Sequence, residues 1–391
     1  MDRRSFLKGT GIATILVAAG GIWRAEDQGI FSVGQGPAYQ PWKDWRRDGS
    51  GGPLSLVRAG ILAASPHNTQ PWLFRVSSSA IELYVDTKRN TGALDPYLRE
   101  QHIALGCALE NLLLAAGANG YSSSLAMLPG KLQSSFVEQP QLVARVELAS
   151  GTRQNSELYE AIPLRHTNRN PYDPKRAVPT EITDALKHLV ENEPDVKVFL
   201  FTADTDREKI ANIISAANNI LYADPEVTRG SERWIRTNWS SVQKHRDGLT
   251  IDAAGLSLTT AAVAKFVPSS LLRWMISDRE DPYLKLLQTP PMFGIIAVRN
   301  RYDQEQSLRA GRIWQRAHLL ATARQLAVRP ANEAVEMIDH EQELGREPRH
   351  AKLLAELTGD ATWHPTFTFY MGYPIREANA SPRRPVRNVI L

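Results

Sequence analysis

The sequence predicts an α+β fold in which sheets are flanked by long helices. Short apolar or alternating runs typical of strands recur along the chain, from residues 73–76 near its beginning to residues 366–370 near its end. Longer stretches between them carry apolar residues at helical spacing. The chain has 391 residues with 42% hydrophobic content, which exceeds the size at which a single core normally keeps growing. One large fused unit and two domains are both compatible with this length.

The elements can be assigned in order from the spacing of apolar residues and from the positions of Pro and Gly. The first part predicts a helix through residues 54–62, a strand hairpin of residues 73–76 and 81–85, a core helix from Asp95 to Gly117, and a strand over residues 142–148. The second part predicts helices near residues 157–162, from Pro179, over 210–221, 231–236 and 305–327, and strands over 196–201, 292–298 and 366–370. The weakly patterned residues 250–275 are expected to form an insertion or a lid.

A run of short polar side chains lies between the first helix and the first strand. Ser65, His67, Asn68 and Gln70 offer hydrogen-bond donors and acceptors, and a proline stands on either side of the last three. Proline fixes φ and restricts the residue before it, so we expect a rigid, non-helical loop. Such a polar rim suits the edge of a flat heterocycle, although a purely structural turn is the alternative.

Three segments resemble the nitroreductase family. Residues 65–72, Ser-Pro-His-Asn-Thr-Gln-Pro-Trp, look like the flavin-contacting loop of that family, and this motif is the most specific of the three. Residues 165–169, with Tyr172, resemble its Arg-x-Ser/Thr-x-Arg/Lys segment, and residues 383–390 are similar to its basic C-terminal strand. The resemblance covers roughly residues 53–391.

The resemblance implies FMN as cofactor and assigns most of its binding site. Arg and Thr at alternate positions of an extended segment supply a planar cation and a hydroxyl on one side, as a phosphate requires. The implied cofactor-binding residues are Ser65, Pro66, Asn68 and Gln70 on one side of the flavin, Arg165 and Thr167 at its phosphate, Arg169 near its N1 and O2 edge, and Arg383 and Arg384 as further phosphate ligands. The family's lysine before the C-terminal arginine matches Pro382 here. Solvated surface arginines are the alternative, and no residue is assigned as catalytic.

The order of the motifs departs from an ordinary nitroreductase, because the loop precedes the arginine segment and does not recur after it. This order resembles the Acg-type branch, in which two diverged copies are fused in one chain. We expect a first half over residues 53–150 and a second over residues 151–391, with an insertion at about 225–285. Each half keeps part of one flavin site, so the chain is expected to be a pseudo-dimeric monomer.

The N-terminus predicts export. Arg3 and Arg4, followed by Phe6, Leu7 and Lys8, fit a twin-arginine signal, and the apolar stretch that follows is short for a membrane span. Residues 1–23 are therefore expected to engage the twin-arginine translocase and to be cleaved or kept as an anchor, with residues 24–52 as a linker. The protein would then be periplasmic or anchored on the outer face of the membrane.

Several function classes are disfavoured by the composition. The net charge of +4 comes from 46 basic and 42 acidic residues, and no nucleic-acid-binding module is recognisable. The single cysteine, Cys107, excludes an intrachain disulfide and a cysteine-ligated metal centre within one chain. No metal-binding motif, nucleophile elbow or dinucleotide fingerprint is present.

The sequence thus predicts an exported FMN-dependent oxidoreductase of the nitroreductase type, which passes hydride or electrons to a small acceptor such as a nitro compound or quinone. Because free NAD(P)H is scarce outside the cytoplasm, a membrane or protein electron donor is expected. The alternative is a non-catalytic protein that binds or sequesters the flavin.

Overall fold

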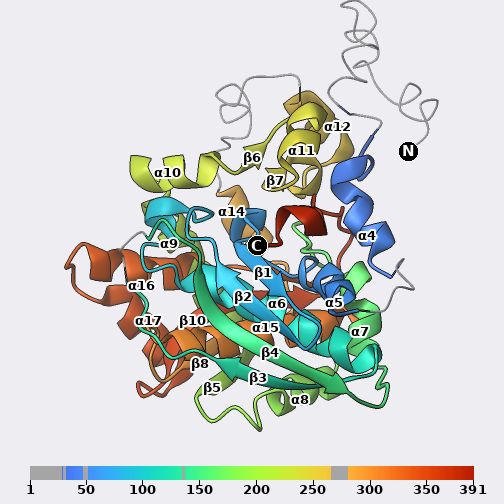
Figure 1. The fold of residues 1–391 in the computed structure, drawn as a ribbon. Helices are drawn as coiled ribbons and strands as arrows, with labels where there is room; N and C mark the ends of the chain where they lie inside the picture. Colours follow the sequence, from blue (N-terminus) through green and yellow to red (C-terminus); the bar gives the residue numbers. More distant parts are fainter. Residues whose placement is uncertain (1–28, 30–31, 47–51, 134–136, 266–280) are drawn as a thin grey trace, which may run out of the picture.

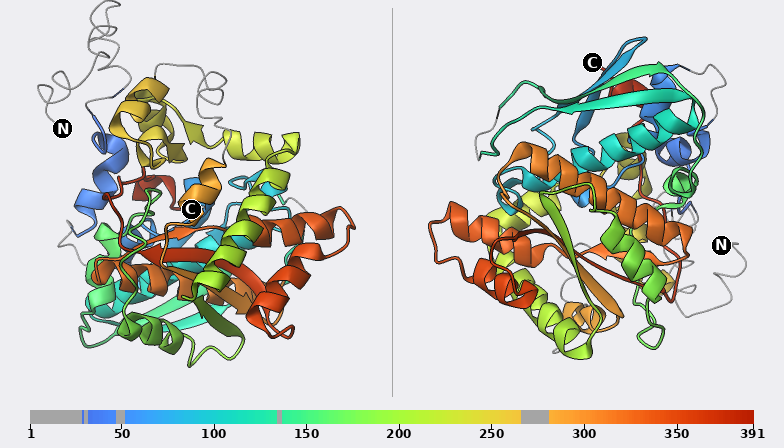
Figure 2. Two further views of the ribbon diagram at one scale, coloured as in Figure 1. Left: turned by 180° about the vertical axis from the view of Figure 1, so that it is seen from behind. Right: turned by 90° about the horizontal axis from the view of Figure 1, so that it is seen from below.

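The computed structural model describes residues 29, 32–46, 52–133, 137–265 and 281–391. The predicted export signal, residues 1–23, lies outside the described residues, and the predicted linker and insertion are described only in part. The core has three layers: two long helices, α6 (Arg99–Ala118) and α15 (Gln304–Ala323), lie between two four-stranded sheets (Figures 1 and 2). The fold is therefore α+β, with sheets packed against long helices, as the sequence predicts.

The first sheet has the strand order β1-β2-β4-β3, and every neighbouring pair is antiparallel. Its strands are β1 (Trp72–Val76), β2 (Ala80–Val85), β3 (Tyr121–Met127) and β4 (Gln141–Ser150). Burial alternates along β2 and β4, which is the pattern of a sheet with one face on the core and one in solvent. The outer face carries charged pairs such as Arg145 with Glu82 and Glu147.

The second sheet has the order β5-β8-β10-β9, again antiparallel throughout. Its strands are β5 (Val196–Phe201), β8 (Met292–Val298), β9 (Ala327–Pro330) and β10 (His364–Gly372). All of β8 is buried, because α15 covers one face while α9 (Asp204–Leu221), α16 (Glu333–Glu343) and α17 (Arg349–Thr358) lie on the other (Figure 2). This double coverage explains why β8 reads as a continuous apolar run in the sequence.

The two sheets repeat one arrangement. In each, two strands are followed by a helix of 20 residues and then by two more strands, and the second strand lies beside the fourth. The second sheet carries additional helices: α9, α10 (Pro225–Glu232), α11 (Trp239–His245), α12 (Leu258–Ala264) and α14 (Pro282–Leu287) lie between β5 and β8 in the sequence, and α16 and α17 lie between β9 and β10.

The central helices α6 and α15 approach closely at two glycines. A Cβ on Gly106 would lie 2.1 Å from the carbonyl oxygen of Leu308, and one on Gly311 would lie 2.0 Å from that of Ile103. Only glycine permits backbones this near to each other. Side chains then fix the register: Glu110 pairs with Arg312 at 3.0 Å and with Arg316 at 2.7 Å.

The remaining elements flank this core. They are η1 (Pro37–Tyr39), α4 (Gln40–Asp44), α5 (Pro53–Gly60), η2 (Pro66–Asn68), η3 (Gly92–Leu94), α7 (Glu157–Ala161), η4 (Ile162–Leu164), α8 (Thr180–His188), the parallel pair β6 (Ile235–Arg236) and β7 (Leu249–Thr250), η5 (Ile251–Ala253) and η6 (Val386–Asn388). Within the described part of the chain, no helix combines the length and the apolar character that a membrane crossing requires.

Three sequence-based assignments differ from the structure. The helix expected over 305–327 ends at Ala323, because Gln325 adopts φ 59° and turns the chain into β9. The amphipathic stretch 231–236 is divided between the end of α10 and the short strand β6. The C-terminal segment 383–390 forms no strand; it contains the turn η6 and a single parallel bridge from Ile390 to Phe74.

Candidate functional site

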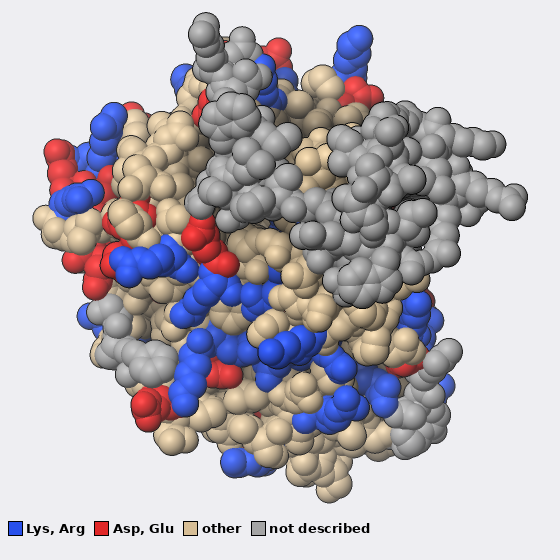
Figure 3. Space-filling view, turned by 90° about the horizontal axis from the view of Figure 1, so that it is seen from above, with Lys and Arg blue, Asp and Glu red and all other residues tan. Residues whose placement is uncertain are grey.

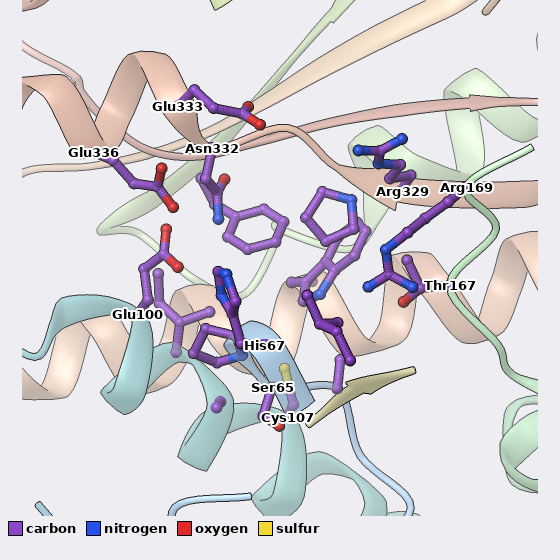
Figure 4. Close-up of a pocket in the computed structure, with 18 of the residues that line it drawn as sticks. Ser65, His67, Glu100, Cys107, Thr167, Arg169, Arg329, Asn332, Glu333 and Glu336 are labelled. Atoms are coloured by element: carbon purple, nitrogen blue, oxygen red, sulfur yellow. The ribbon is translucent and has the colours of Figure 1, made fainter. Parts of the chain in front are cut away.

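A cavity of about 190 Å³ opens beside the two central helices (Figure 4). Its wall combines residues from both halves of the sequence: Ala64–His67 from the early loop, Glu100, Ile103, Ala104 and Cys107 from α6, Thr167 and Arg169, Tyr222 and Leu249, Trp314 from α15, Arg329 and Pro330 from β9, Asn332, Glu333 and Glu336 at the start of α16, and Phe367 from β10. Of the residues assigned from sequence, Ser65, Pro66, Thr167 and Arg169 line this cavity.

The early loop is held in an unusual backbone conformation. His67, Asn68 and Gln70 have φ values of 46°, 54° and 51°, in the left-handed region of backbone conformation that residues other than glycine rarely adopt. The expected non-helical loop contains one short 3₁₀ turn, which begins at Pro66. The Ser65 hydroxyl accepts a hydrogen bond from the backbone amide of Gln70 at 3.1 Å. The loop is thus folded back on itself, with Ser65 to His67 facing the cavity.

Asn68 and Gln70 face away from the cavity and join the loop to distant segments. The Asn68 amide donates to the carbonyl oxygens of Pro382 at 2.9 Å and Gly248 at 3.2 Å. Gln70 donates to Arg246 O at 2.9 Å and accepts from the backbone amide of Arg384 at 2.8 Å. Both side chains therefore lie in the wall behind the cavity, and their direct contact with a flavin stays a prediction.

Two buried arginines meet directly behind this loop. Arg165 donates to Leu62 O at 3.1 Å and Arg383 donates to the next carbonyl, Ala63 O, also at 3.1 Å; Arg383 also donates to the Asn68 side chain. Both residues are 2% exposed. The sequence predicted that a late and an early segment would converge here, and the structure brings them together.

These two guanidinium groups lack an anionic partner. No carboxylate of the described residues pairs with either one, and the Nε atom of each is buried without a hydrogen-bond partner. Burial lowers the pKa of Arg165 to about 10, and burial together with the charge of Arg165 lowers that of Arg383 well below its usual range. A buried pair of like charges is costly, so this site fits an anionic group such as a phosphate.

Trp42, on the short helix α4, packs against the guanidinium groups of Arg165 and Arg383. Its ring lies 4.7 Å from the guanidinium carbon of Arg383 and 5.9 Å from that of Arg165, and its indole donates to Ser381 O at 2.7 Å. His166 meets the same ring edge-on, with centroids 4.6 Å apart. Trp42 therefore packs on the cationic site; its position so early in the sequence gave no indication of this.

Positive charge also lines one end of the cavity, where Arg169 and Arg329 lie beside Thr167 (Figure 4). Arg169 donates to Ala253 O at 3.1 Å, and burial, followed by the charge of Arg329, lowers its pKa to about 10. Burial, followed by the charge of Arg169, lowers the pKa of His67 to about 4, so this imidazole is neutral near pH 7. On the outer surface, Lys and Arg form a band across the face seen in Figure 3.

The opposite end of the cavity is acidic. Glu100, Glu333 and Glu336 line it, and the carboxyl groups of Glu100 and Glu336 point toward each other (Figure 4). Burial raises the pKa of Glu100 to about 7 and raises that of Glu336 well above its usual range, with the charge of Glu100 as the next cause. This group could not be recognised from the sequence, because its members come from α6 and α16; the spacing of Glu333 and Glu336 by one helical turn is the only local signal.

This pKa shift makes a prediction about stability. Because the pKa of Glu100 is about 7 in the folded state and the usual value is 4.5, the folded state binds more protons between these values, and wild-type stability is lost as the pH rises through this window. The glutamine variant Glu100→Gln does not ionise and does not show this loss. Its free energy of unfolding, measured relative to that of wild type, should therefore rise by up to about 3 kcal/mol from pH 5 to pH 8. Urea unfolding at both pH values measures this; the exposed control Glu356→Gln should show no such gain, and an equal change in both variants would contradict the assignment.

Part of the chain is similar in sequence to known proteins. No family model matches the chain. Two curated relatives from Mycobacterium tuberculosis, of strains H37Rv and CDC 1551 and both named as NAD(P)H nitroreductases, are 27% identical over 122 residues, which is 30% of this chain and 33% of theirs. The chain thus matches about a third of the length of these relatives.

Solved structures that are similar to this chain include a nitroreductase with bound FMN from Bacteroides fragilis, with 14% identity and a TM-score of 0.34. This likeness covers 59% of this chain and 95% of that one. The FMN-dependent nitroreductase NfnB from Mycobacterium smegmatis, in complex with NADPH, gives 17% identity and a TM-score of 0.35, over 59% of this chain and 96% of that one.

Proposed function

We propose that this chain is an FMN-dependent oxidoreductase of the nitroreductase type that reduces a small acceptor such as a nitro compound or quinone. The observation that carries the proposal is the buried, anion-free pair Arg165 and Arg383, which adjoins a cavity lined by Ser65, Thr167 and Arg169. The three sequence motifs that resemble the nitroreductase family meet at this one place. The names of the two curated relatives agree with this function.

In this proposal Arg165 and Arg383 hold the FMN phosphate, and their unpaired Nε atoms supply the remaining donors. Ser65 and Pro66 hold one side of the flavin, Arg169 supplies positive charge near its N1 and O2 edge, and Asn68, Gln70 and Arg384 brace the loop. When bound, FMN supplies the redox chemistry by taking up and passing on electrons. Burial raises the pKa of both carboxyls at the acidic end, which favours a proton held between Glu100 and Glu336, and Trp42 covers the arginines.

We also propose that the two halves are diverged copies fused into a pseudo-dimeric monomer with one flavin, as in the Acg-type branch. The repeated order of strands around α6 and α15 supports this. The halves would be residues 53–150 and 151–391, with an insertion at about 225–285.

Export by the twin-arginine translocase remains part of the proposal and rests on the sequence of residues 1–23 alone. That route carries folded proteins and suits one that acquires its cofactor in the cytoplasm. An exported protein would take electrons from a membrane or protein donor, whereas the names of the curated relatives favour NAD(P)H.

A second candidate function is flavin binding without turnover. The segment around β7 favours it, because Leu249 lines the cavity, Gly248 bonds to the early loop, and Ala253 accepts from Arg169. These contacts cover the cavity and would limit access to a bound flavin.

One experiment separates the two functions. The purified protein is titrated with FMN, reduced with dithionite, and mixed with nitrobenzene derivatives or quinones in a stopped-flow instrument. The oxidoreductase proposal expects one flavin per chain and reoxidation that is faster with an acceptor than in buffer alone. Flavin binding without acceleration supports the second candidate, and a chain that binds no flavin contradicts both. Mixing the oxidised protein with NADPH tests the electron donor, since rapid bleaching contradicts a purely membrane or protein donor.

A further inference from the structure

The acidic end of the cavity combines buried carboxyl groups with aromatic walls. Glu100 and Glu336 are 5% and 7% exposed, and Trp314 and Phe367 line the same cavity with their ring centroids 4.6 Å apart. Carboxylates next to aromatic faces are the combination that recognises organic cations, through ion pairing and cation–π attraction.

Polar atoms at this end are left without protein partners. Oε1 of Glu100 accepts no hydrogen bond from a described residue; Arg99 Nη2 forms only a long ion pair with it, at 3.6 Å. The side chain of Asn332, which is 8% exposed and lines the cavity, accepts from the Thr368 amide through Oδ1, while its Nδ2 donates to no described residue. These atoms are placed to receive a ligand.

The local arginines compensate the charge of this end only in part, because their hydrogen bonds go mainly to Asp339 and to backbone carbonyls. Arg99 donates to Asp339 at 2.7 Å and to Thr366 O, and Arg301 binds the other oxygen of Asp339 at 2.7 Å. In the described part of the chain, carboxyl groups therefore outnumber guanidinium groups around this end. The carboxyl groups are those of Asp95, Glu100, Glu333, Glu336 and Asp339, and the guanidinium groups are those of Arg99, Arg301 and Arg329. The titratable and charged groups around Glu100 and Glu336 are Asp95 and Arg99 next to or on α6, His67, Tyr222, Arg301, Arg329, and Glu333 and Asp339 on α16.

We propose that the acidic end of the cavity binds the positively charged group of an organic cation, such as an aryl-ammonium or pyridinium compound, between Glu100, Glu336 and the rings of Trp314 and Phe367. That this cation is the electron acceptor rests on the proposed oxidoreductase function; that it binds does not. A cation replaces the missing positive charge and favours ionisation of the carboxyls. Its binding should therefore strengthen as the pH rises through about 7, where Glu100 ionises.

Two probes of equal shape test the proposal: (4-nitrobenzyl)trimethylammonium and its uncharged carbon isostere, in which the trimethylammonium nitrogen is replaced by carbon. Isothermal titration calorimetry with the full protein should give a dissociation constant about tenfold lower for the cation at pH 8, and a much smaller preference at pH 5.5. The double variant Glu100→Gln/Glu336→Gln should lose most of this preference and keep only the part due to the aromatic rings, while Glu356→Gln, an exposed change on α17, should keep all of it. Equal affinity of wild type for both probes at pH 8, or a preference in the double variant as large as in wild type, would overturn the proposal.

The folding of the double variant is checked by circular dichroism. If it does not fold, the single variants Glu100→Gln and Glu336→Gln and the wild-type pH series decide whether the carboxyl groups bind the cation.

Stopped-flow reoxidation of the reduced protein by the two probes tests whether the bound cation is an electron acceptor. Neither probe reoxidising a bound flavin would contradict the proposed activity while leaving the calorimetric result intact, whereas equal reoxidation rates with equal affinities would contradict the cation site alone.

Discussion

Arg383→Met and Arg165→Met should each weaken FMN binding by about 100-fold or more, because truncating one partner of a buried charge pair costs 2–5 kcal/mol. Flavin fluorescence titration measures this directly. The matched control is Arg387→Met, which makes the same change four residues along the same segment at an exposed position.

The stability of the flavin-free variants separates a binding role from a structural one. Removing either guanidinium leaves backbone carbonyls without a donor, which destabilises, but it also removes a buried charge that has no anion, which stabilises. We therefore expect the flavin-free melting temperature to change little, while the rise in melting temperature caused by saturating FMN disappears. A variant at position 383 that binds FMN as tightly as Arg387→Met would contradict the phosphate assignment.

Gly311→Ala should destabilise the protein by several kcal/mol and weaken flavin binding at the same time. Its Cβ would lie 2.0 Å from Ile103 O and 3.0 Å from the Cα of Gly106, and backbone atoms cannot yield without separating α6 from α15. Both helices line the cavity, through Ile103 and Cys107 on one and Trp314 on the other, so their separation changes its shape.

The neighbouring helix α6 offers a control for this substitution on α15. A Cβ on Gly117 would meet nothing nearer than the carbonyl oxygen of Gln154 at 3.6 Å, so Gly117→Ala should be neutral or stabilising by up to about 1 kcal/mol. Urea unfolding compares the two variants. Similar unfolding midpoints for Gly311→Ala and Gly117→Ala would show that the helices can move apart without cost and would contradict this packing.

The parts of the fold that could be predicted from the sequence are those with a strong local pattern. The strands over 196–201 and 292–298 have the predicted bounds. The second is a continuous apolar run bounded by turn residues, which specifies a buried strand. β3 was missed, since Tyr121–Met127 is an edge strand with three consecutive exposed serines. The C-terminal strand was wrong, because Pro385 precedes a 3₁₀ turn and the chain pairs with β1 only at Ile390.

The candidate site divides in the same way. The convergence of residues 65–70 with Arg165 and Arg383 was predicted, since each motif resembles a known one by itself. The acidic end could not be predicted, because Glu100 and Glu336 are brought together only by the packing of α6 near α16. The role of Trp42 depends on a similar long-range contact, with residues 381 and 383.

The most direct test of the proposed flavin site is a crystal structure of the protein, from crystals grown in saturating FMN. We expect one flavin per chain, with its phosphate in hydrogen-bonding contact with both Arg165 and Arg383 and its ring in the cavity between Ser65 and Arg169. A flavin bound elsewhere, or a cavity that remains without flavin while the two arginines keep only the protein partners described above, would contradict it.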